Sequence, residues 1–383
     1  MLQQNHNRLK RILFLFFKAW NFGFLPEPTF FILNALRLSI YPMYLLYGEF
    51  CILWHLFVQI EDYTDLIEVG FNVTFLIGNY QALMIYLGIA IYNKRRILEV
   101  FDFYEGLLED QDVLVRELRR RHFGRSTRIA YFCAKYFLMA TFVSFLFIVA
   151  YDLVRSNFVA VMLFYTPGFP RTSIWFYPVN LIHQFSLFFT AYEIIMFSDI
   201  VIMIMIAYCQ AEMSVITELI GLLNNNDLAR RDPRFVIRKI LEVHLEISSQ
   251  AKKMTAAFYH IYFHKLLAIM LYLGSIFLVF HSLDQDLSAA VLSAAVMMTQ
   301  VFVLCYFGQM LTNSSQELLD AVYMTQWYEM TVRDQKDLLM LMMRLSRPVK
   351  VETFGFGDIS IFTFVRICKA SASYAAIIYT VLK

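Results

Sequence analysis

The sequence contains little charge for its length of 383 residues. Charged residues make up 17% of the chain, whereas ordinary soluble domains carry about 25%. So few charged side chains cannot cover a soluble protein of this size, which excludes most soluble enzymes, coiled coils and disordered chains. The net charge of +2 is too balanced to indicate a nucleic-acid partner.

The sequence also lacks the patterns of a disulfide framework, a metal site and an enzyme. Its five cysteines are far apart and form no CxxC pair, so no disulfide framework is expected. GxGxxG, P-loop, HExxH and GxSxG motifs are missing. His260 and His264 have the i, i+4 spacing of two metal ligands, but no carboxylate or cysteine close in sequence completes a site. We expect no catalytic residue, no metal and no cofactor.

Long apolar runs, by contrast, are abundant. Hydrophobic residues make up 59% of the chain, and the mean hydropathy is +0.55. A helix that spans a bilayer needs roughly 20 largely apolar residues. Seven stretches satisfy this requirement: Leu38–Val58, Leu66–Tyr92, Ile129–Tyr151, Val179–Tyr208, Tyr262–Leu283, Leu287–Leu311 and Ile359–Leu382. The sequence therefore predicts an all-α polytopic membrane protein with seven transmembrane helices.

The basic residues between these spans predict the orientation of the chain. Of the 33 Lys and Arg residues, 26 lie in residues 1–37, 93–128, 209–261 and 312–358, and only three lie in the segments on the opposite side. Cytoplasmic loops carry the excess of Lys and Arg in membrane proteins. We therefore expect a cytoplasmic N-terminus and an extracellular C-terminus, the reverse of a G-protein-coupled receptor. The DRY and NPxxY motifs of such receptors are also missing.

The segment 1–37 contains a short apolar run at residues 12–17. This run is too short for a signal-peptide core. It predicts a short interfacial helix, with Lys10, Arg11 and Lys18 at the lipid headgroups.

The predicted cytoplasmic loops have helical patterns. Apolar residues within Asp232–Lys253 recur close to every 3.6 positions, so 209–261 is expected to form a long helical loop. Ser314–Leu345 shows a similar pattern, which predicts a cytoplasmic anchor helix within 312–358. We expect these helices to extend from the spans and to pack together below the membrane.

Charged residues within the spans suggest either function or adaptation to the interface, because charges inside a membrane are costly. Lys135 and Lys265 lie near the inner ends of their spans, so we expect both to snorkel to the interface. Arg366 and Lys369 are expected to mark the point where a cytoplasmic helix ends and a shorter spanning part, residues 370–382, begins.

The last span carries a recognisable closing pattern. Residues 362–374 read FTFVRICKASASY, so a Ser-x-Ser-Tyr run precedes apolar residues that continue almost to the end. This pattern, together with the number of spans, the orientation, the length and the short tail, resembles insect odorant receptors over nearly the whole chain. Gustatory receptors end in Gln-Phe where this chain has Thr380-Val381, and the odorant co-receptor has a much longer second cytoplasmic loop than 209–261. The resemblance therefore favours a ligand-tuning odorant receptor subunit.

The resemblance implies a non-selective cation channel in the plasma membrane of olfactory sensory neurons. The subunit would form a heterotetramer with the odorant co-receptor, and residues 359–383 would line the shared pore. Tyr374, Ile378 and Val381 share one helix face, and Ile378 matches the hydrophobic gate of the family by its distance from the C-terminus. Opening of that gate would widen the hydrophobic ring or expose polar neighbours such as Thr380. The alternative is that Ile378 only packs between helices.

The resemblance also places a ligand pocket in the outer half of the six-helix bundle formed by residues 38–311, among the second, third, fourth and sixth spans. The residues expected to line it are Phe71, Phe75, Asn79, Ser144, Phe147, Ile148, Tyr151, Phe185, Phe188, Tyr192, Met297 and Met298. Such a lining is aromatic with few hydrogen-bonding groups, which predicts a small, apolar or aromatic volatile ligand. Ordinary helix packing explains any single one of these residues equally well.

Two other functions remain open. A homomeric, gustatory-type ligand-gated channel would share the same architecture. A solute transporter could also have seven spans, although no inverted repeat and no Gly- or Pro-broken last helix is visible in the sequence. In each case the spans would contact membrane lipids.

Overall fold

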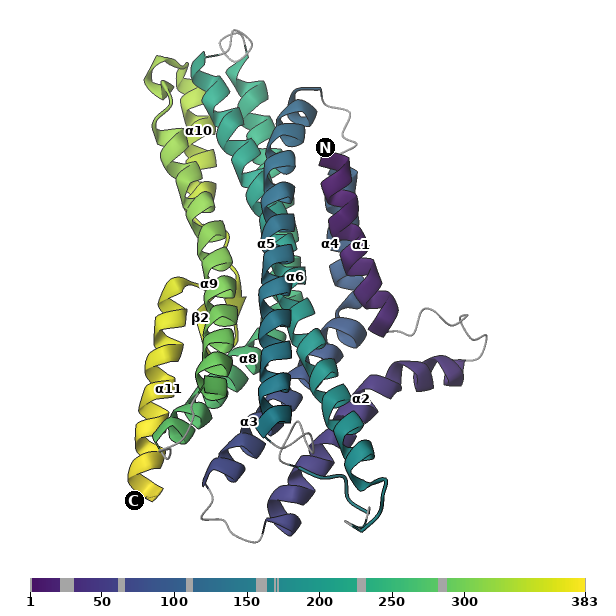
Figure 1. The fold of residues 1–383 in the computed structure, drawn as a ribbon. Helices are drawn as coiled ribbons and strands as arrows, with labels where there is room; N and C mark the ends of the chain where they lie inside the picture. Colours follow the sequence, from purple (N-terminus) through teal and green to yellow (C-terminus); the bar gives the residue numbers. More distant parts are fainter. Residues whose placement is uncertain are drawn as a thin grey trace.

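A computed structural model of the chain describes residues 2–20, 31–60, 66–107, 113–155, 164–168, 170, 172–225, 232–281 and 288–382. Long helices run side by side through most of the molecule (Figure 1). Their bounds are α1 (Leu2–Trp20), α2 (Phe31–Trp54), α3 (Leu66–Tyr86), α4 (Lys94–Leu107), α5 (Val113–Arg155), α6 (Phe176–Asn225), α8 (Pro233–His281), α9 (Ser288–Tyr323), α10 (Val332–Leu345) and α11 (Ile361–Leu382). The predicted all-α class is confirmed.

Each of the seven predicted spans coincides with a helix. Two of these helices, α2 and α3, end in short π-helical segments, η1 (His55–Gln59) and η2 (Leu87–Tyr92). Five helices, α3, α5, α6, α8 and α9, are long and apolar enough to cross a membrane, whereas α2 and α11 are not among these five. The ends of the described chain lie at opposite ends of the bundle, with α10 at the end nearer the N-terminus (Figure 1).

Helix α6 forms the centre of the bundle. Nearly all of its apolar stretch is buried, including every residue from Ile200 to Ile206. It packs against α5, α9, α8 and α3. A helix that is apolar on all sides must be surrounded by other helices or by lipid, so α6 provides the rigid axis around which the candidate site is arranged.

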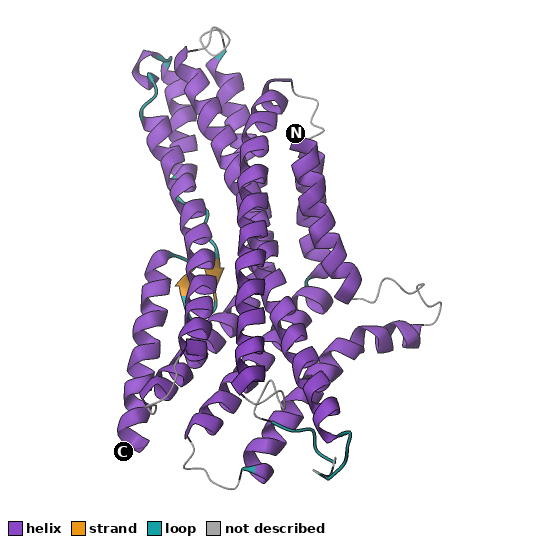
Figure 2. Cartoon of the chain, in the orientation of Figure 1, coloured by secondary structure: helices purple, strands orange, loops and turns teal. Residues whose placement is uncertain are grey.

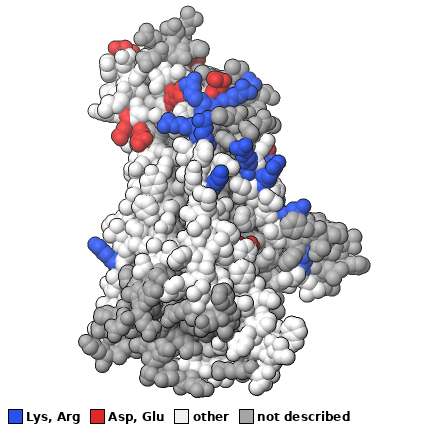
Figure 3. Space-filling view, viewed as in Figure 1, with Lys and Arg blue, Asp and Glu red and all other residues white. Residues whose placement is uncertain are grey.

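The outer surface of α5 carries large apolar side chains. Phe132, Tyr136, Met139, Val143 and Phe147 are each about half exposed and recur every three or four residues. A continuous exposed apolar stripe of this kind fits contact with lipid rather than water. Charged side chains instead gather at the end of the molecule that holds α10, and the white surface below them carries few (Figure 3).

The segment 312–358 differs from the single anchor helix that the sequence predicted. Helix α9 continues to Tyr323, and a 3-10 turn, η3 (Trp327–Glu329), separates it from α10. The new helix starts at a cap, because the Thr331 hydroxyl accepts a hydrogen bond from the Asp334 backbone N–H at 3.3 Å. Within the described residues, the prediction missed this break and the hairpin that follows.

That hairpin consists of β1 (Glu352–Thr353) and β2 (Gly357–Asp358), drawn in orange in Figure 2. Its turn requires glycine, because Gly355 and Gly357 have φ angles of 72° and 77°. The Thr353 hydroxyl donates to the backbone oxygen of Tyr259 at 2.8 Å, so the hairpin is attached to α8. The hairpin therefore fixes the point from which the last helix begins.

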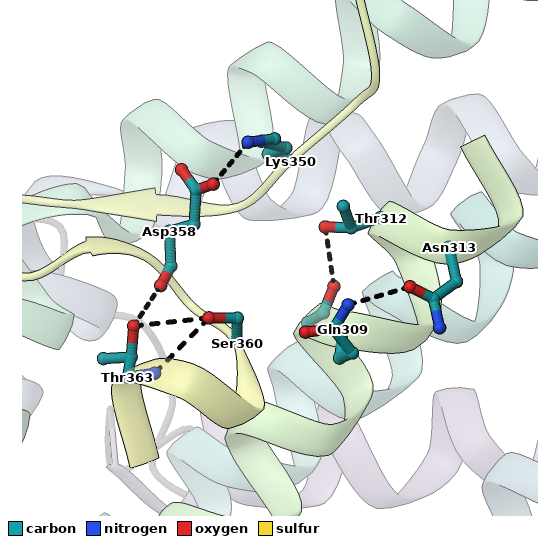
Figure 4. Close-up of polar contacts among 8 residues, drawn as sticks. Gln309, Thr312, Asn313, Lys350, Asp358, Ser360 and Thr363 are labelled. Atoms are coloured by element: carbon teal, nitrogen blue, oxygen red, sulfur yellow. Dashed lines mark hydrogen bonds and ion pairs between the residues drawn. The ribbon is translucent and has the colours of Figure 1, made fainter. Parts of the chain in front are cut away.

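Helix α11 starts at Ile361, two residues later than predicted, and its first turn is held by a small polar network (Figure 4). The Thr363 hydroxyl donates to the backbone oxygen of Asp358 at 2.5 Å, while Ser360 accepts from the Thr363 N–H at 3.4 Å. Lys350 pairs with the Asp358 carboxylate at 2.5 Å. These contacts join the chain after α10 to the start of α11.

The close approach of α9 to this junction depends on Gly308. A Cβ atom at that position would lie 2.3 Å from the backbone oxygen of Ile359. On the same stretch of α9, the Thr312 hydroxyl donates to the Gly308 carbonyl at 3.1 Å, and Gln309 donates to Asn313 at 2.8 Å (Figure 4). Any larger residue at Gly308 would push α9 away from the start of α11.

A helix is present within residues 1–37, as α1, and its position at the membrane interface stays a prediction. One face of α1 is buried against the protein through Leu9, Leu13, Phe17 and Trp20, and the helix packs on α5. Lys10 pairs with a glutamate of α4 at 2.5 Å. Phe14 and Leu15 of the apolar run are about half exposed, so the run packs one face of α1 onto the bundle and leaves apolar side chains on the other.

Lys265 does not snorkel, contrary to the prediction. Its side chain is fully buried in α8 and forms an ion pair with Asp199 of α6. The Lys265 ammonium also donates to the Ser198 hydroxyl at 3.2 Å. A buried charge is tolerated only with a partner of opposite charge, and sequence position alone does not reveal that partner. Lys135, in contrast, is exposed, and its snorkelling stays a prediction.

Candidate functional site

A cavity lies among six helices in the half of the bundle away from α10. Its walls come from α2, α3, α5, α6, α8 and α9, and its volume is about 80 Å³, which suits only a small ligand. The cavity lies near the beginning of α9 and the end of α5, whereas α10 packs on the other part of α9.

The most buried wall of the cavity is aromatic. The Phe145 ring, only 3% exposed, lies 4.9 Å from the Phe188 ring and 4.8 Å from the Tyr192 ring between centroids. Phe75 meets Phe188 edge to face at 5.8 Å. Aromatic pairs at these distances stabilise one another beyond their buried area. The wall therefore offers ring faces and edges in fixed positions.

Two buried amide side chains supply unusual polar atoms in the cavity wall. Asn79 donates through Nδ2 to the Leu45 backbone oxygen at 2.8 Å, and Gln300 donates through Nε2 to the Met196 sulfur at 3.5 Å. In the part of the chain that the structure describes, the side-chain oxygens of both amides have no hydrogen-bond partner. An unpaired buried acceptor costs about 1–3 kcal/mol, so a donor that reached either covered oxygen would be favoured.

Three hydroxyl groups at the cavity already have hydrogen-bond partners within the protein. The Tyr192 hydroxyl donates to Thr141 at 3.0 Å, and Thr141 donates to the Phe137 backbone oxygen at 2.8 Å. The Ser144 hydroxyl donates to the Ala140 backbone oxygen at 3.0 Å. Each of these hydroxyl groups already donates a hydrogen bond within the protein, so it has less to gain from a ligand than the two amide oxygens.

The cavity brings together part of the predicted lining. Seven predicted residues line it, namely Phe75, Asn79, Ser144, Ile148, Phe188, Tyr192 and Met297. Phe71, Phe147, Tyr151, Phe185 and Met298 are not among the lining residues. Phe147 and Phe185 are 51% and 41% exposed on the outer surface. Consecutive helix positions face directions about 100° apart, so Met298 points away from the cavity that Met297 lines. Its sulfur accepts a hydrogen bond from Cys368 of α11 at 3.8 Å.

The prediction also missed several lining residues. Ile52 of α2 and Tyr272 of α8 come from spans that the family resemblance did not include. Thr141 and Phe145 complete a stripe on α5 that already contained Ile148. Gln300 could have been found from sequence, since a polar amide within an otherwise apolar run indicates an internal role.

Helix α11 has one buried and one exposed face. Thr363, Ile367, Ser371 and Ala375 recur every four residues and are buried against the bundle. The Ser371 hydroxyl donates to the Met270 backbone oxygen on α8 at 3.1 Å. The opposite face is open, so it is free to meet a further chain or a water-filled path.

The two predicted pore residues whose side chains are described, Tyr374 and Thr380, are both exposed. The Tyr374 ring covers Gly274 of α8, where a Cβ atom would lie 2.4 Å from the ring. Thr380 is exposed, and its hydroxyl donates to the Ile377 backbone oxygen at 2.7 Å. The side chains of Ile378 and Val381 lie outside the described residues.

Short segments of the chain are similar to odorant receptors of Drosophila melanogaster. Odorant receptor 67c is 30% identical over 83 residues, and putative odorant receptor 69a, isoform A, is 36% identical over 70 residues. These segments cover 22% and 18% of this chain and only 20% and 18% of the two relatives.

The similarity in fold extends much further. The structure of the insect olfactory receptor OR5 from Machilis hrabei in complex with eugenol aligns with a TM-score of 0.81 at 13% identity and covers 99% of each chain. The family described as 7tm Odorant receptor matches residues 66–372. Because this match spans most of the sequence, the chain belongs to the 7tm Odorant receptor family.

Proposed function

We propose that the chain is a ligand-tuning subunit of an odorant-gated, non-selective cation channel, assembled with the odorant co-receptor as a heterotetramer. The family is one of receptors rather than enzymes. The observation that carries the proposal is the cavity, which combines an aromatic wall with two buried amide oxygens that have no partner among the described residues. The membrane would be the plasma membrane of olfactory sensory neurons.

The orientation proposed for the chain follows the distribution of charge. The end that holds α10 carries most of the visible basic side chains (Figure 3), and basic loops stay in the cytoplasm. The N-terminus and the α10 end would then be cytoplasmic, and the C-terminus and the cavity would lie toward the outside. A volatile ligand arriving from outside would enter the nearer half of the bundle.

The ligand that best fits the cavity is a small, mainly apolar molecule with an aromatic ring and one hydroxyl group. The ring would stack against the aromatic wall that includes Phe145 and Phe188. The hydroxyl would donate to the free oxygen of Asn79 or Gln300 and remove the cost of leaving that acceptor unpaired. Shape and dispersion would provide the rest of the affinity.

Two helices connect this cavity with the proposed pore helix α11. On α9, Met297 lines the cavity while its neighbour Met298 contacts Cys368 of α11. On α8, Tyr272 lines the cavity while Gly274, half a turn further, receives the Tyr374 ring. A ligand that shifts α8 or α9 would therefore act directly on α11, and the exposed face of α11 would line the channel.

The decisive experiment is to express the full chain alone and together with an odorant co-receptor, and to record currents under a panel of aromatic alcohols and hydrocarbons. The proposal expects odorant-evoked current only from the pair. Current from this chain alone would instead indicate a homomeric, gustatory-type channel. Uptake of solute without current would indicate a transporter.

A further inference from the structure

A second cavity lies at the α10 end of the molecule, far from the odorant cavity along α8. It is an open groove of about 610 Å³ between α8 and the segment that joins α10 to the hairpin. We call it the basic groove. Its charged residues and histidines are His244, Lys252, His260, Arg344, Arg347, Lys350 and Glu352. The cations therefore outnumber the single carboxylate.

Most of these cations are not neutralised by the protein. Lys350 pairs with Asp358 at 2.5 Å. Among the described residues, Lys252, Arg344 and Arg347 of the groove form no ion pair and no side-chain hydrogen bond. Like charges around one groove repel each other unless an anion joins them. The uncompensated charge therefore points to a ligand with several negative charges.

The floor of the groove contains a buried histidine with an unused ring nitrogen. His244 is only 2% exposed, and its Nε2 atom lies 3.4 Å from the Ser248 hydroxyl. Its Nδ1 atom has no hydrogen-bond partner in the described part of the chain. Burial, together with the nearby Arg344, lowers the pKa of His244 to about 4. The ring is therefore neutral at physiological pH and adds a polar contact, not charge.

The other end of the groove reaches a belt of exposed aromatic residues. Tyr259 and His260 line that end, and both rings lie 6.3 Å from the Phe354 ring between centroids. Phe354 and Phe362 are 51% and 71% exposed. Tyr and Trp side chains gather at the membrane–water interface, and Tyr259 lies at this end of the groove. The groove therefore opens where lipid headgroups and apolar chains meet.

We propose that the basic groove binds the phosphorylated headgroup of an anionic lipid, with the acyl chains lying along the aromatic belt. Basic pockets on the cytoplasmic side of membrane proteins bind such headgroups. A headgroup with more than one phosphate would match the three unpaired cations Lys252, Arg344 and Arg347. By joining α8 to the chain after α10, the lipid would brace the hairpin from which α11 starts.

The test measures binding of a short-chain phosphatidylinositol bisphosphate to the purified full chain. Arg344→Gln/Arg347→Gln removes two cations from the groove, and we expect it to bind about 30-fold more weakly. Lys252→Gln removes a cation from the α8 wall of the groove, and we expect it to weaken lipid binding as well. The matched control is Arg333→Gln, which removes an exposed cation of α10 outside the groove. Each variant must elute as a single species and unfold at the wild-type temperature without lipid.

Three results would overturn the proposal. Equal lipid affinity in the wild type and both groove variants would show that the groove is not the site. Equal affinity for soluble inositol trisphosphate and for the lipid would show that the anion is a free phosphate compound. Loss of lipid binding when the chain assembles with a co-receptor would show that a neighbouring subunit fills the groove.

Discussion

Replacing Gln300 by leucine removes one of the two unpaired amide oxygens at the odorant cavity and leaves an apolar side chain that is one atom shorter. In the wild type, the Gln300 side-chain oxygen has no partner among the described residues, and its nitrogen is held by the Met196 sulfur at 3.5 Å. A ligand hydroxyl would donate to this oxygen. In the variant, the same hydroxyl would be buried without an acceptor, so the preference between alcohol and hydrocarbon ligands should reverse.

The size of the effect follows from the cost of an unpaired polar group. That cost is about 1–3 kcal/mol for a buried donor or acceptor, which corresponds to about a 5-fold to 150-fold change in EC50. Because Gln300 is 1% exposed, solvent cannot replace the missing contact. We therefore expect the wild type to favour an alcohol over its methyl isostere by a factor in this range.

The assay records odorant-evoked current from cells that express the chain with a co-receptor. Ligands are applied as matched pairs, such as 2-phenylethanol and propylbenzene, in which a methyl group replaces the hydroxyl. Gln309→Leu serves as the control, because Gln309 lies on the same helix but donates to Asn313 outside the cavity. Only the Gln300 variant should change the ratio of the two EC50 values.

An unchanged ratio in Gln300→Leu and in Asn79→Leu, across all responding pairs, would refute the reasoning about the two amide oxygens. It would leave the cavity itself intact, because the aromatic wall could still select by shape. A change of the ratio in Gln309→Leu would show that the effect arises elsewhere on α9.

Three further changes test the contacts around the cavity and the last helix. Lys265→Met should lower the free energy of unfolding by about 3–5 kcal/mol, because it leaves Asp199 unpaired. The double variant Lys265→Met/Asp199→Leu should recover most of that loss in a thermal unfolding assay. Equal losses of stability in the single and the double variant would argue against an ion pair. Gly274→Ala should change the resting current by displacing the tyrosine ring that covers it, whereas Gly221→Ala, with open space at its Cβ, should not. Ile378→Ala should raise the resting current or alter ion permeability if a hydrophobic ring closes the pore. A resting current and an ion permeability equal to those of the wild type would exclude Ile378 as the gate.

The sequence predicted the helices well because long apolar runs leave few alternatives to a membrane-spanning helix. It predicted individual lining residues less well, because a small rotation decides which neighbour faces inward. Met297 lines the cavity and Met298 contacts α11, although both side chains are identical. On α5, Phe145 is buried whereas Phe147, two positions later, is exposed, so rotation about the helix axis again decides which side chain faces inward.

Tertiary partners explain the remaining errors. The sequence position of Lys265 suggested snorkelling, but the presence of Asp199 on a neighbouring helix allows the ammonium to be buried. The hairpin at 352–358 was missed because each strand has only two residues, which is too short for an alternating pattern to appear. Both features depend on contacts between segments distant in sequence.

Helix α8 links all of the regions to which we assign a role. From its start it lines the basic groove at His244, pairs with α6 at Lys265, lines the odorant cavity at Tyr272 and supports α11 at Gly274. Ligands at the groove and at the cavity would therefore act on one element. Linkage then requires reciprocity: if the lipid raises the affinity for an odorant, the odorant must raise the affinity for the lipid by the same factor. Measuring lipid affinity with and without an activating odorant would test this coupling, and a factor of one in either direction would mean that the two sites are independent.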